Sequence, residues 1–337
     1  MKKEIILNNN KNGKIKLNDD TVYWKAKSKI WFWLSILSFV LAFTINLFVP
    51  FAQTVEPFYY RIFLIIFIFV LLIFYFLSIF SNSIKKNLYH KSQFLLGIGI
   101  ALAIWDLLTT KSNIFKLPFF PGPVHIIEIM VRDWKLLIIS SLYSMRLFFA
   151  GLIAGVVLGI GTGILIGWNR QWHYWLFPIV KISGIIPAIA WIPITIAIFP
   201  NSFLAGTFLI FISSWFSVSS MTADGIASTP KAYFEVAKTL GANEKYLLFS
   251  IAVPNAAPNI FVGISIATGF AFVTLVVSEM IGAKAGLGWY INWAKGWSAY
   301  NKVYAAIIIM AIAFSIILAI IDAFRKYVLR WQRGILK

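Results

Sequence analysis

The stretch GLIAGVVLGIGTGILIG, residues 151–167, has no charged side chain and a glycine at every fourth position. It lies within an apolar run, 143–168, that is long enough to cross a bilayer. Glycines at this spacing line one helix face, where another backbone can approach closely. They are Gly151, Gly155, Gly159, Gly163 and Gly167. The pattern predicts a tightly packed membrane helix, and we favour a partner helix within the same chain over a seam between two copies.

Composition places most of the chain in a membrane. Of its 337 residues, 60% are hydrophobic and 12% are charged, and the mean hydropathy is +0.82. A soluble domain carries about 25% charged residues, so this much apolar surface has to face lipid. The apolar runs cover 30–49, 61–81, 94–110, 143–168, 175–199, 204–222, 255–277 and 303–323. We therefore predict an all-α integral membrane protein with about eight transmembrane helices.

Positive charge orients these helices. The net charge is +18, and with the N-terminus inside, the cytoplasmic segments hold 20 lysines and arginines against 8 in the outer segments. This bias is typical of a multi-pass membrane protein with both termini in the cytoplasm. The basic residues therefore indicate a lipid bilayer, and no nucleic acid, as their partner. The first apolar run begins too late and is too long for a cleavable signal peptide.

The first part of the chain differs in amino-acid composition from the rest. Residues 1–29 are rich in Lys and Asn, which predicts a loosely ordered cytoplasmic tail. The runs at 30–49 and 61–81 lack glycine and carry no charge beyond Arg61 at one edge. We predict that they form a hairpin that faces lipid on all sides. Gly, Pro and polar residues from about residue 94 onward indicate helices that pack on one another.

Prolines interrupt the run at 175–199. They are Pro178, Pro187 and Pro193, with Pro200 directly after the run. Each internal proline removes a backbone hydrogen bond, so we predict a kinked helix whose freed carbonyls face protein or a watery cavity. Lys181 lies in the same run. For this lysine we favour an ammonium that reaches the cytoplasmic headgroups over a role inside the protein.

The segment 115–137 falls outside the membrane in this topology. Val124, Ile127, Met130 and Val131 recur at helical spacing after a proline-rich start. Such a helix, with apolar residues on one face, fits the membrane interface. A plain connector between two spans fits the same residues, and the sequence leaves both readings open.

Residues 228–254, STPKAYFEVAKTLGANEKYLLFSIAVP, form a polar interruption between two apolar runs. Thr229 is an expected N-cap with Pro230 at the first helical position, and Gly241 is an expected left-handed helix end. Asn243 can cap a second short helix that Pro254 would stop. An apolar stripe of the first helix comprises Tyr233, Phe234, Val236, Ala237 and Leu240. This pattern predicts a helical module on the cytoplasmic surface with an apolar face suited to another protein.

The module resembles the "EAA" signature of binding-protein-dependent ABC importer permeases. That signature is Glu-Ala-Ala, three residues, Gly, nine residues and Ile-x-Leu-Pro. Here Glu235-Val236-Ala237, Gly241 and Ile251-Ala252-Val253-Pro254 keep the spacing, with Val236 and Val253 as departures. Further stretches, including IIPAIAWIPITIAIF and VVSEMIGAKAGLGWYI, resemble the nitrate, sulfonate, taurine and bicarbonate branch. The resemblance covers roughly residues 94–330.

The resemblance implies a type I importer permease core of six helices at 93–330, with a coupling loop at 223–249. The tail at 1–29 and the hairpin at 30–92 precede that core. The implied partners are a cytoplasmic ABC ATPase dimer, a second copy of this chain and an extracytoplasmic solute-binding protein on the outer loops around 111–135 and 278–302. The implied ATPase-coupling residues are Glu235, Val236, Ala237, Lys238, Gly241, Ala242 and Pro254. The implied location is the cytoplasmic membrane of a prokaryote.

No motif predicts catalysis by this chain. GAKAGLGW lacks the order of a nucleotide-binding P-loop, the chain has no cysteine, and its three histidines are too scattered for a metal site. We expect no cofactor on this subunit, with ATP and magnesium bound by the partner ATPase. The residues we expect along the substrate path are Ser183, Trp191, Thr268, Thr274 and Ser278. The competing interpretation is that their hydroxyls bond only to carbonyls of their own helices.

The sequence does not choose the cargo. The branch that the chain resembles suggests a small anion such as a sulfonate, nitrate or bicarbonate, whereas the same fold also carries vitamin precursors and aromatic compounds. An ion-coupled secondary transporter would need acidic residues along its spans or a symmetric repeat, and the sequence contains neither pattern. A membrane-embedded enzyme would need polar residues clustered at one depth, and Asp106, Arg146 and Glu279 are scattered in sequence.

Overall fold

The computed structural model describes residues 20–331, with side chains from residue 30 onward except at 82 and 83. All regular elements of this range are helices. The first are α1 (Asp20–Phe48), α2 (Phe58–Phe80), α3 (Asn82–Asp106), the π-helical turn η1 (Leu107–Lys111) and α4 (Pro123–Arg132). Next come α5 (Trp134–Trp168), α6 (Arg170–Ile185), the 3-10 turn η2 (Ala188–Trp191), α7 (Ile192–Ile198) and α8 (Ser202–Ala227). The last are α9 (Lys231–Thr239), α10 (Glu244–Tyr246), the π-helical η3 (Leu247–Ala252), α11 (Val253–Gly282), α12 (Leu287–Gly296) and α13 (Tyr300–Val328).

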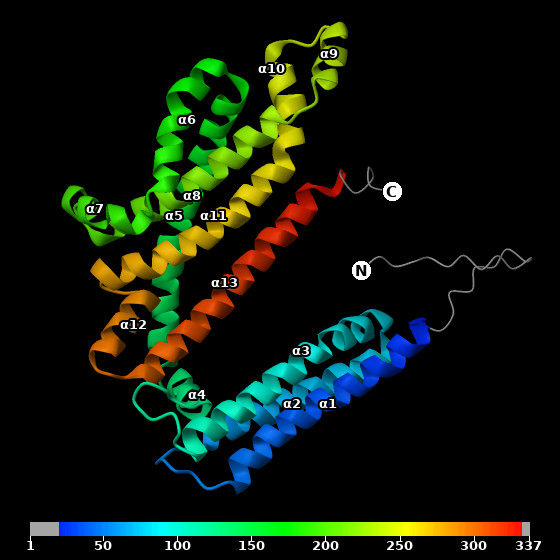
Figure 1. Ribbon diagram of the computed structural model, residues 1–337, viewed down its shortest axis with the longest axis vertical. Coiled ribbons are helices and arrows are strands. Elements are labelled where there is room, and N and C mark those ends of the chain that lie inside the picture. Colours follow the sequence, from blue (N-terminus) through cyan, green and yellow to red (C-terminus); the bar gives the residue numbers. More distant parts are fainter. Residues whose placement is uncertain (1–19, 332–337) are drawn as a thin grey trace, which may run out of the picture. The chain divides into compact units, whose positions relative to one another are not determined.

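Seven helical segments are long and apolar enough to cross a membrane, and the broken helix α6–α7 makes eight if it is one bent span. Each apolar run of the sequence lies in one of these segments. The predicted all-helical membrane architecture is therefore confirmed (Figure 1). The chain divides into two compact units, Met1–Glu128 and Ile129–Lys337. This division by compactness does not test the functional boundaries at 30–92 and 93–330, which stay predictions.

The unit that ends at Glu128 is built on α1, which packs along α3, with α2 beside both. Phe32, Phe39 and Ala42 of α1 are fully or almost fully buried in the apolar core of this unit. The prediction that both hairpin helices face lipid on all sides is therefore wrong for α1, because α3 covers one of its faces. It fits α2, of which only 17% is buried. Helix α1 also begins at Asp20, so part of the predicted polar tail is helical, and 1–19 lie outside the described residues.

Polar side chains hold the end of this bundle where α1 meets η1. Asp106, fully buried, accepts hydrogen bonds from Asn46 Nδ2 at 3.0 Å and from the Thr110 hydroxyl. Arg61 Nε donates to Asn46 Oδ1 at 3.0 Å, and Lys111 Nζ donates to the carbonyls of Asn46 and Val49 at 3.0 and 2.6 Å. The lysine and arginine thus satisfy carbonyls at the C-terminus of α1, where the helix dipole favours positive charge.

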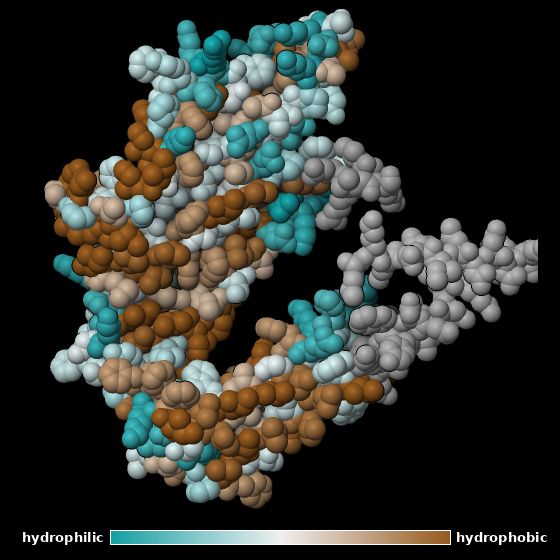
Figure 2. All heavy atoms as spheres, viewed as in Figure 1, coloured by the Kyte–Doolittle hydropathy of each residue, from teal (hydrophilic) through white to brown (hydrophobic). Residues whose placement is uncertain are grey.

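In the second unit, α8 lies between α5 and α11 (Figure 1). The five glycines predicted to allow close packing all face α8. A Cβ atom on Gly163 would lie 2.6 Å from the Ser219 carbonyl oxygen, and one on Gly167 would lie 2.8 Å from that of Ala223. The partner of the glycine face is thus a helix of the same chain. Hydrophobic residues cover much of the surface around α7 in Figure 2.

The predicted kinked helix is broken. The axes of Arg170–Ile185 and Ala188–Ile198 differ in direction by 96°. Pro187 stands at the break, Pro193 occupies the first turn of α7 and Pro178 remains inside α6. Pro187 has no amide hydrogen to continue the ladder, so the chain changes direction there. Lys181 of α6 has an exposed side chain and forms no ion pair within the described residues.

The predicted helix around 124–131 is present as α4, so the helical spacing was interpreted correctly. Val124 is buried in the core of the first unit, and Ile127 packs against that core. Val131 of the same predicted face is 43% exposed. The interfacial helix and the plain connector both stay predictions.

Candidate functional site

The polar interruption at 228–254 folds as a helical module that projects from the end of α8 and α11 (Figure 1). Hydrophilic residues gather at that end of the unit in Figure 2. Helix α9 begins at Lys231, with Pro230 in the capping position and no side-chain cap. Thr229 was predicted as the N-cap of this helix, and that prediction is wrong. Its hydroxyl accepts a hydrogen bond from Asn255 Nδ2 at 3.1 Å instead. That bond ties the start of the module to the first turn of α11.

Gly241 ends α9 as predicted. Its φ of +83° is in the left-handed region, and its amide donates to the Lys238 carbonyl at 3.0 Å. Glycine adopts this conformation without the steric cost of a Cβ atom. Asn243 then caps α10, because its Oδ1 accepts a bond from the Tyr246 amide at 2.8 Å. Lys238 pairs across the turn with Glu244 at 3.7 Å, and both side chains are largely exposed.

The second helix of the module does not stop at Pro254. Helix α10 runs through the π-helical turn η3 into α11, so residues 244–282 form one helical segment. Pro254 lies in the first turn of α11 after the change in hydrogen-bond pattern. The π-helical turn changes the hydrogen-bond pattern just before the proline, and the helix continues through Pro254 without a break. The predicted stop at Pro254 is therefore wrong.

The apolar stripe of α9 is divided between two directions. Ala237 is buried, and the ring of Phe234 lies against Trp168 with centroids 5.8 Å apart. Tyr233, Val236 and Leu240 point outward and are 55%, 61% and 83% exposed. The inward pair fastens α9 to the membrane helices. The outward three leave an apolar patch on a module with charged neighbours, and such a patch marks a site for a partner protein.

The residues predicted along a substrate path do not form one cluster of free hydroxyls. Ser183, Thr268 and Ser278 donate to carbonyls of their own helices at 2.7 to 2.9 Å. Thr274 is buried on α11, and Trp191 ends η2 with an indole nitrogen that has no partner within the described residues. The hydrogen bonds fit the competing interpretation for three of them. Contact with a substrate stays a prediction.

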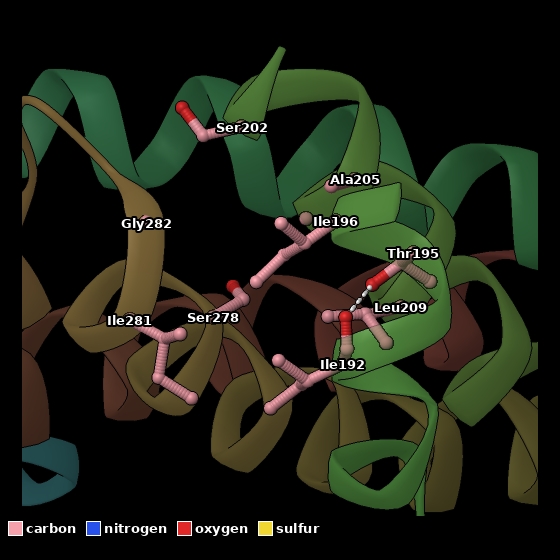
Figure 3. Close-up of a pocket in the computed structure, with 10 residues that line it drawn as sticks. Ile192, Thr195, Ile196, Ser202, Ala205, Leu209, Ser278, Ile281 and Gly282 are labelled. Atoms are coloured by element: carbon pink, nitrogen blue, oxygen red, sulfur yellow. Dashed lines mark hydrogen bonds between the residues drawn. The ribbon is translucent and has the colours of Figure 1, made fainter. Parts of the chain in front are cut away.

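One of these residues, Ser278, lines a small cleft between α7, α8 and α11, with a volume of about 20 Å³ (Figure 3). Apolar side chains of Ile192, Ile196 and Ile281 converge on it from two helices. The Thr195 hydroxyl in its wall donates to the Ile192 carbonyl at 2.9 Å. The cleft contains no charged lining residue and has room for about one water molecule, so a path for a solute at this place stays a prediction.

Sequence reasoning did not give Glu279 a role, although it lies one residue beyond Ser278. Glu279 is 1% exposed, and its Oε2 accepts bonds from Ser144 Oγ at 2.9 Å and the Gly288 amide at 2.8 Å. Ser144 Oγ in turn accepts from the Leu287 amide at 2.8 Å. A carboxylate of α11 and a hydroxyl of α5 thus cap the first turn of α12.

Gly286 shows why the sequence following Glu279 is glycine-rich. Its φ is +125°, and a Cβ atom there would lie 2.5 Å from the Glu279 carboxyl carbon. A Cβ atom on Gly288 would lie 2.6 Å from the Val276 carbonyl oxygen. The glycines of the run GAKAGLGW therefore allow this loop to lie close to the buried carboxylate of Glu279. A single acidic residue ahead of Gly-Leu-Gly was the signal that could have indicated this contact.

A second polar contact fixes the same helix. The Asp133 carboxylate accepts bonds from Tyr290 OH at 2.8 Å and from Lys302 Nζ at 2.6 Å. Burial and the neighbouring Asp133 carboxylate raise the pKa of Tyr290 above its ordinary value. The contact joins the first half of α12 to the starts of α5 and α13.

The helical fold and the water-facing module define a multi-pass membrane transport subunit. Residues 155–334 match the family of binding-protein-dependent transport system inner membrane components. The match covers more than half of the chain, and the chain belongs to this family.

Curated relatives extend the similarity. The chain is 30% identical over 245 residues to SsuC of Bacillus subtilis, a permease protein assigned to aliphatic sulfonates transport; the match covers 70% of this chain and 86% of SsuC. It is 28% identical over 252 residues to the bicarbonate transport system permease protein CmpB of Synechococcus elongatus, covering 70% and 87%. It is 27% identical over 219 residues to the nitrate import permease protein NrtB of the same organism, covering 60% and 75%. The expected branch is therefore confirmed.

A solved structure shares the fold. The chain aligns with a chain of the MetNI methionine ABC transporter in an inward-facing conformation, with a TM-score of 0.50 and 20% identity. The alignment covers 58% of this chain and 98% of the other. This likeness concerns the arrangement of helices alone.

Proposed function

We propose that this chain is the permease subunit of an ATP-driven importer for a small anion, of the sulfonate, nitrate or bicarbonate kind. Family membership makes it a membrane component of a binding-protein-dependent transport system. The names of the relatives SsuC, CmpB and NrtB support an anionic cargo. An extracytoplasmic binding protein would deliver that cargo to the outer loops, including the one that carries α12.

The observation that carries the proposal is the apolar patch of Tyr233, Val236 and Leu240 on α9. We propose that α9 inserts this patch into a cytoplasmic ABC ATPase. Glu235 and Lys238 would contribute charged contacts, while Ala237, Gly241, Ala242 and Pro254 would hold the shape of the module. Because Phe234 and Trp168 fasten α9 to α5, a movement of the ATPase would be transmitted to the membrane helices.

The remaining parts of the mechanism follow from this assignment. ATP and magnesium would bind the ATPase subunits, and this chain would catalyse no reaction and hold no cofactor. Two copies of the chain would pair around a central path that opens alternately to each side. The cleft lined by Ser278 would belong to that path. Both termini would lie in the cytoplasm of a prokaryotic cell, as the distribution of lysine and arginine supports.

The test is co-purification of the ATPase with the tagged chain in mild detergent, followed by mass spectrometry. We expect Val236→Asp and Leu240→Asp to release the ATPase, because a charge in a buried apolar contact is costly. Lys231→Glu is the matched control, since it changes charge on the same helix away from the apolar patch, and it should retain the ATPase. The coupling role fails if the aspartate variants fold and keep the ATPase.

Cargo is tested separately from coupling. The binding protein that co-purifies would be screened against sulfonates, nitrate and bicarbonate, and against aromatic vitamin precursors. Binding of an anion supports the proposed cargo. Binding of a neutral aromatic compound would leave the permease assignment intact and reject the anion.

A further inference from the structure

The connection between η1 and α4 exposes apolar side chains where a water-facing loop would expose polar ones. Ile114, Phe119 and Phe120 are 63%, 57% and 49% exposed. Phe115 and Leu117 are exposed as well, and the rings of Phe115 and Phe120 lie 5.1 Å apart. Lys116 is the charged residue among them. We call residues 114–120 the aromatic loop.

Polar groups around the aromatic loop point toward the protein. Gln53 Nε2 donates to Asn113 Oδ1 at 2.7 Å, and the Ala52 amide donates to the Thr110 carbonyl at 3.0 Å. The Thr109 and Thr110 side chains lie so close to Gly122 that a Cβ atom there would clash with both. The loop therefore has a polar interior and an apolar exterior. Exposed apolar side chains are unfavourable in water, and aromatic side chains are enriched where a bilayer meets water.

The backbone holds this loop beside the end of a membrane span. The Phe115 amide donates to the Leu108 carbonyl at 3.0 Å, and Leu108 lies within the span Ile84–Lys111. The loop thus turns back along the helix that it leaves. The same span carries exposed apolar side chains at Ile100, Ile104 and Leu107. The aromatic loop thus lies at the end of a span that itself exposes apolar residues.

We propose that the aromatic loop is a membrane anchor whose occupant is lipid at the boundary between headgroups and acyl chains. Its aromatic and aliphatic side chains contact that boundary, where aromatic rings are common in membrane proteins. Lys116 extends its ammonium toward headgroup phosphates. The binding protein expected on 111–135 then has less of this segment to contact. Which leaflet is occupied depends on the orientation proposed above, whereas lipid contact does not depend on the transport function.

Site-directed spin labelling of the full chain in nanodiscs of phosphatidylethanolamine and phosphatidylglycerol tests the anchor. The chain has no cysteine, so each single cysteine variant carries one label. Leu117→Cys reports on the aromatic loop, with Ile114→Cys as a second position if the first variant does not fold. Ile104→Cys, on the exposed face of α3, is the reference for lipid, and Lys245→Cys, on the cytoplasmic module, is the reference for water.

We expect the label at Leu117 to collide with oxygen and to be protected from a water-soluble nickel chelate, as at Ile104. Its oxygen-to-nickel accessibility ratio should exceed that at Lys245 several-fold. A ratio equal to that at Lys245 would overturn the anchor. Loss of collisions with both reagents would also overturn it, because the loop would then be covered by protein. Loss that appears only when the binding protein is added would assign the loop to that protein. Transport and ATPase binding are not read out, so a failure here leaves the proposed function untouched.

Discussion

In the unit from Ile129 onward, α5 and α8 meet along a row of five glycines, whereas in the preceding unit α1 and α3 meet closely at the single glycine Gly99 and through a buried polar cluster. A Cβ atom on Gly163 would lie 2.6 Å from the Ser219 carbonyl oxygen, and one on Gly99 would lie 2.8 Å from the Cβ atom of Ser38. Lipid gives apolar helices little reason to associate, so helices in membranes depend on close backbone approach or on polar contacts. Both units combine these means, with more glycine contacts in the second unit and a larger charged network in the first.

The two buried carboxylates extend this comparison. Asp106 of the first unit is bonded to side chains and is linked through Asn46 to Arg61. Glu279 of the second unit is bonded to a backbone amide and a serine, and no cation pairs with it in the described part of the chain. One carboxylate belongs to a charged network, and the other caps a helix. We therefore expect loss of the negative charge to destabilise the fold more at Asp106 than at Glu279.

The largest effect is expected from breaking the glycine face. Gly163→Leu would place a side chain against the Ser219 carbonyl and Thr222, and we expect a loss of at least about 3 kcal/mol of stability from overpacking. Gly161→Leu is the matched control, because nothing lies within 4 Å of a Cβ atom there. Thermal unfolding in detergent measures both. Equal melting temperatures for the two variants would show that α5 and α8 do not depend on this contact.

A smaller loss is expected at Asp106. Asp106→Leu leaves Asn46 Nδ2 and the Thr110 hydroxyl without an acceptor, which should cost about 2 kcal/mol. Asp106→Asn keeps the shape but removes the charge that balances Arg61 and Lys111. Because the cluster is charged, we expect the asparagine variant to lose most of the same stability in thermal unfolding. Wild-type stability of Asp106→Asn would contradict a role for the charge.

Glu279 should respond differently to the same pair of changes. Glu279→Leu removes the acceptor of the Gly288 amide and should cost about 1 kcal/mol or somewhat more. Glu279→Gln retains an acceptor oxygen and has no cation to lose, so we expect a melting temperature near that of the wild type. Hydrogen exchange of the Leu287 and Gly288 amides checks the site directly. Fast exchange in the glutamine variant would show that the carboxylate charge is required.

The smallest effect concerns pH and the first unit alone. Burial lowers the pKa of His125 below its ordinary 6.5, and its two ring nitrogens have no partner among the described residues. The neutral ring therefore stabilises the fold above pH 6.5, and this stability is lost as pH falls through the lowered folded pKa. We expect His125→Gln to reduce the pH dependence of the melting temperature below pH 6.5. His173→Gln, at an exposed position on α6, should leave it unchanged.

Local patterns carried much of the prediction. Apolar runs located all the spans, since length and composition alone decide whether a helix can cross a bilayer. Gly241 and Asn243 were identified correctly because a helix end depends on the residues next to it. The helical module at 228–254 was predicted from its local sequence pattern. Its outward residues were not separated from its inward ones, because that depends on where Trp168 lies.

Contacts between residues far apart in the sequence were not predicted from the sequence. Asp106, Asn46 and Arg61 come from three separate segments, and nothing in their local sequence indicates that they meet. Thr229 was expected to cap its own helix, yet Asn255 occupies its hydroxyl. Pro254 was expected to stop a helix, yet the π-helical turn before it lets the helix continue. Each of these outcomes is decided by partners far along the chain or by the shape of a neighbouring turn.

By itself, the sequence determined that this protein is a helical membrane subunit, where its spans lie and where its water-facing module interrupts them. These properties follow from hydropathy and from residues a few positions apart. Only the tertiary structure decided that the glycine face meets α8, that Glu279 caps α12 and that the aromatic loop turns back beside its span. Such contacts depend on which surfaces the fold brings within a few ångströms of one another. A local sequence pattern does not specify the distance between residues that are far apart along the chain.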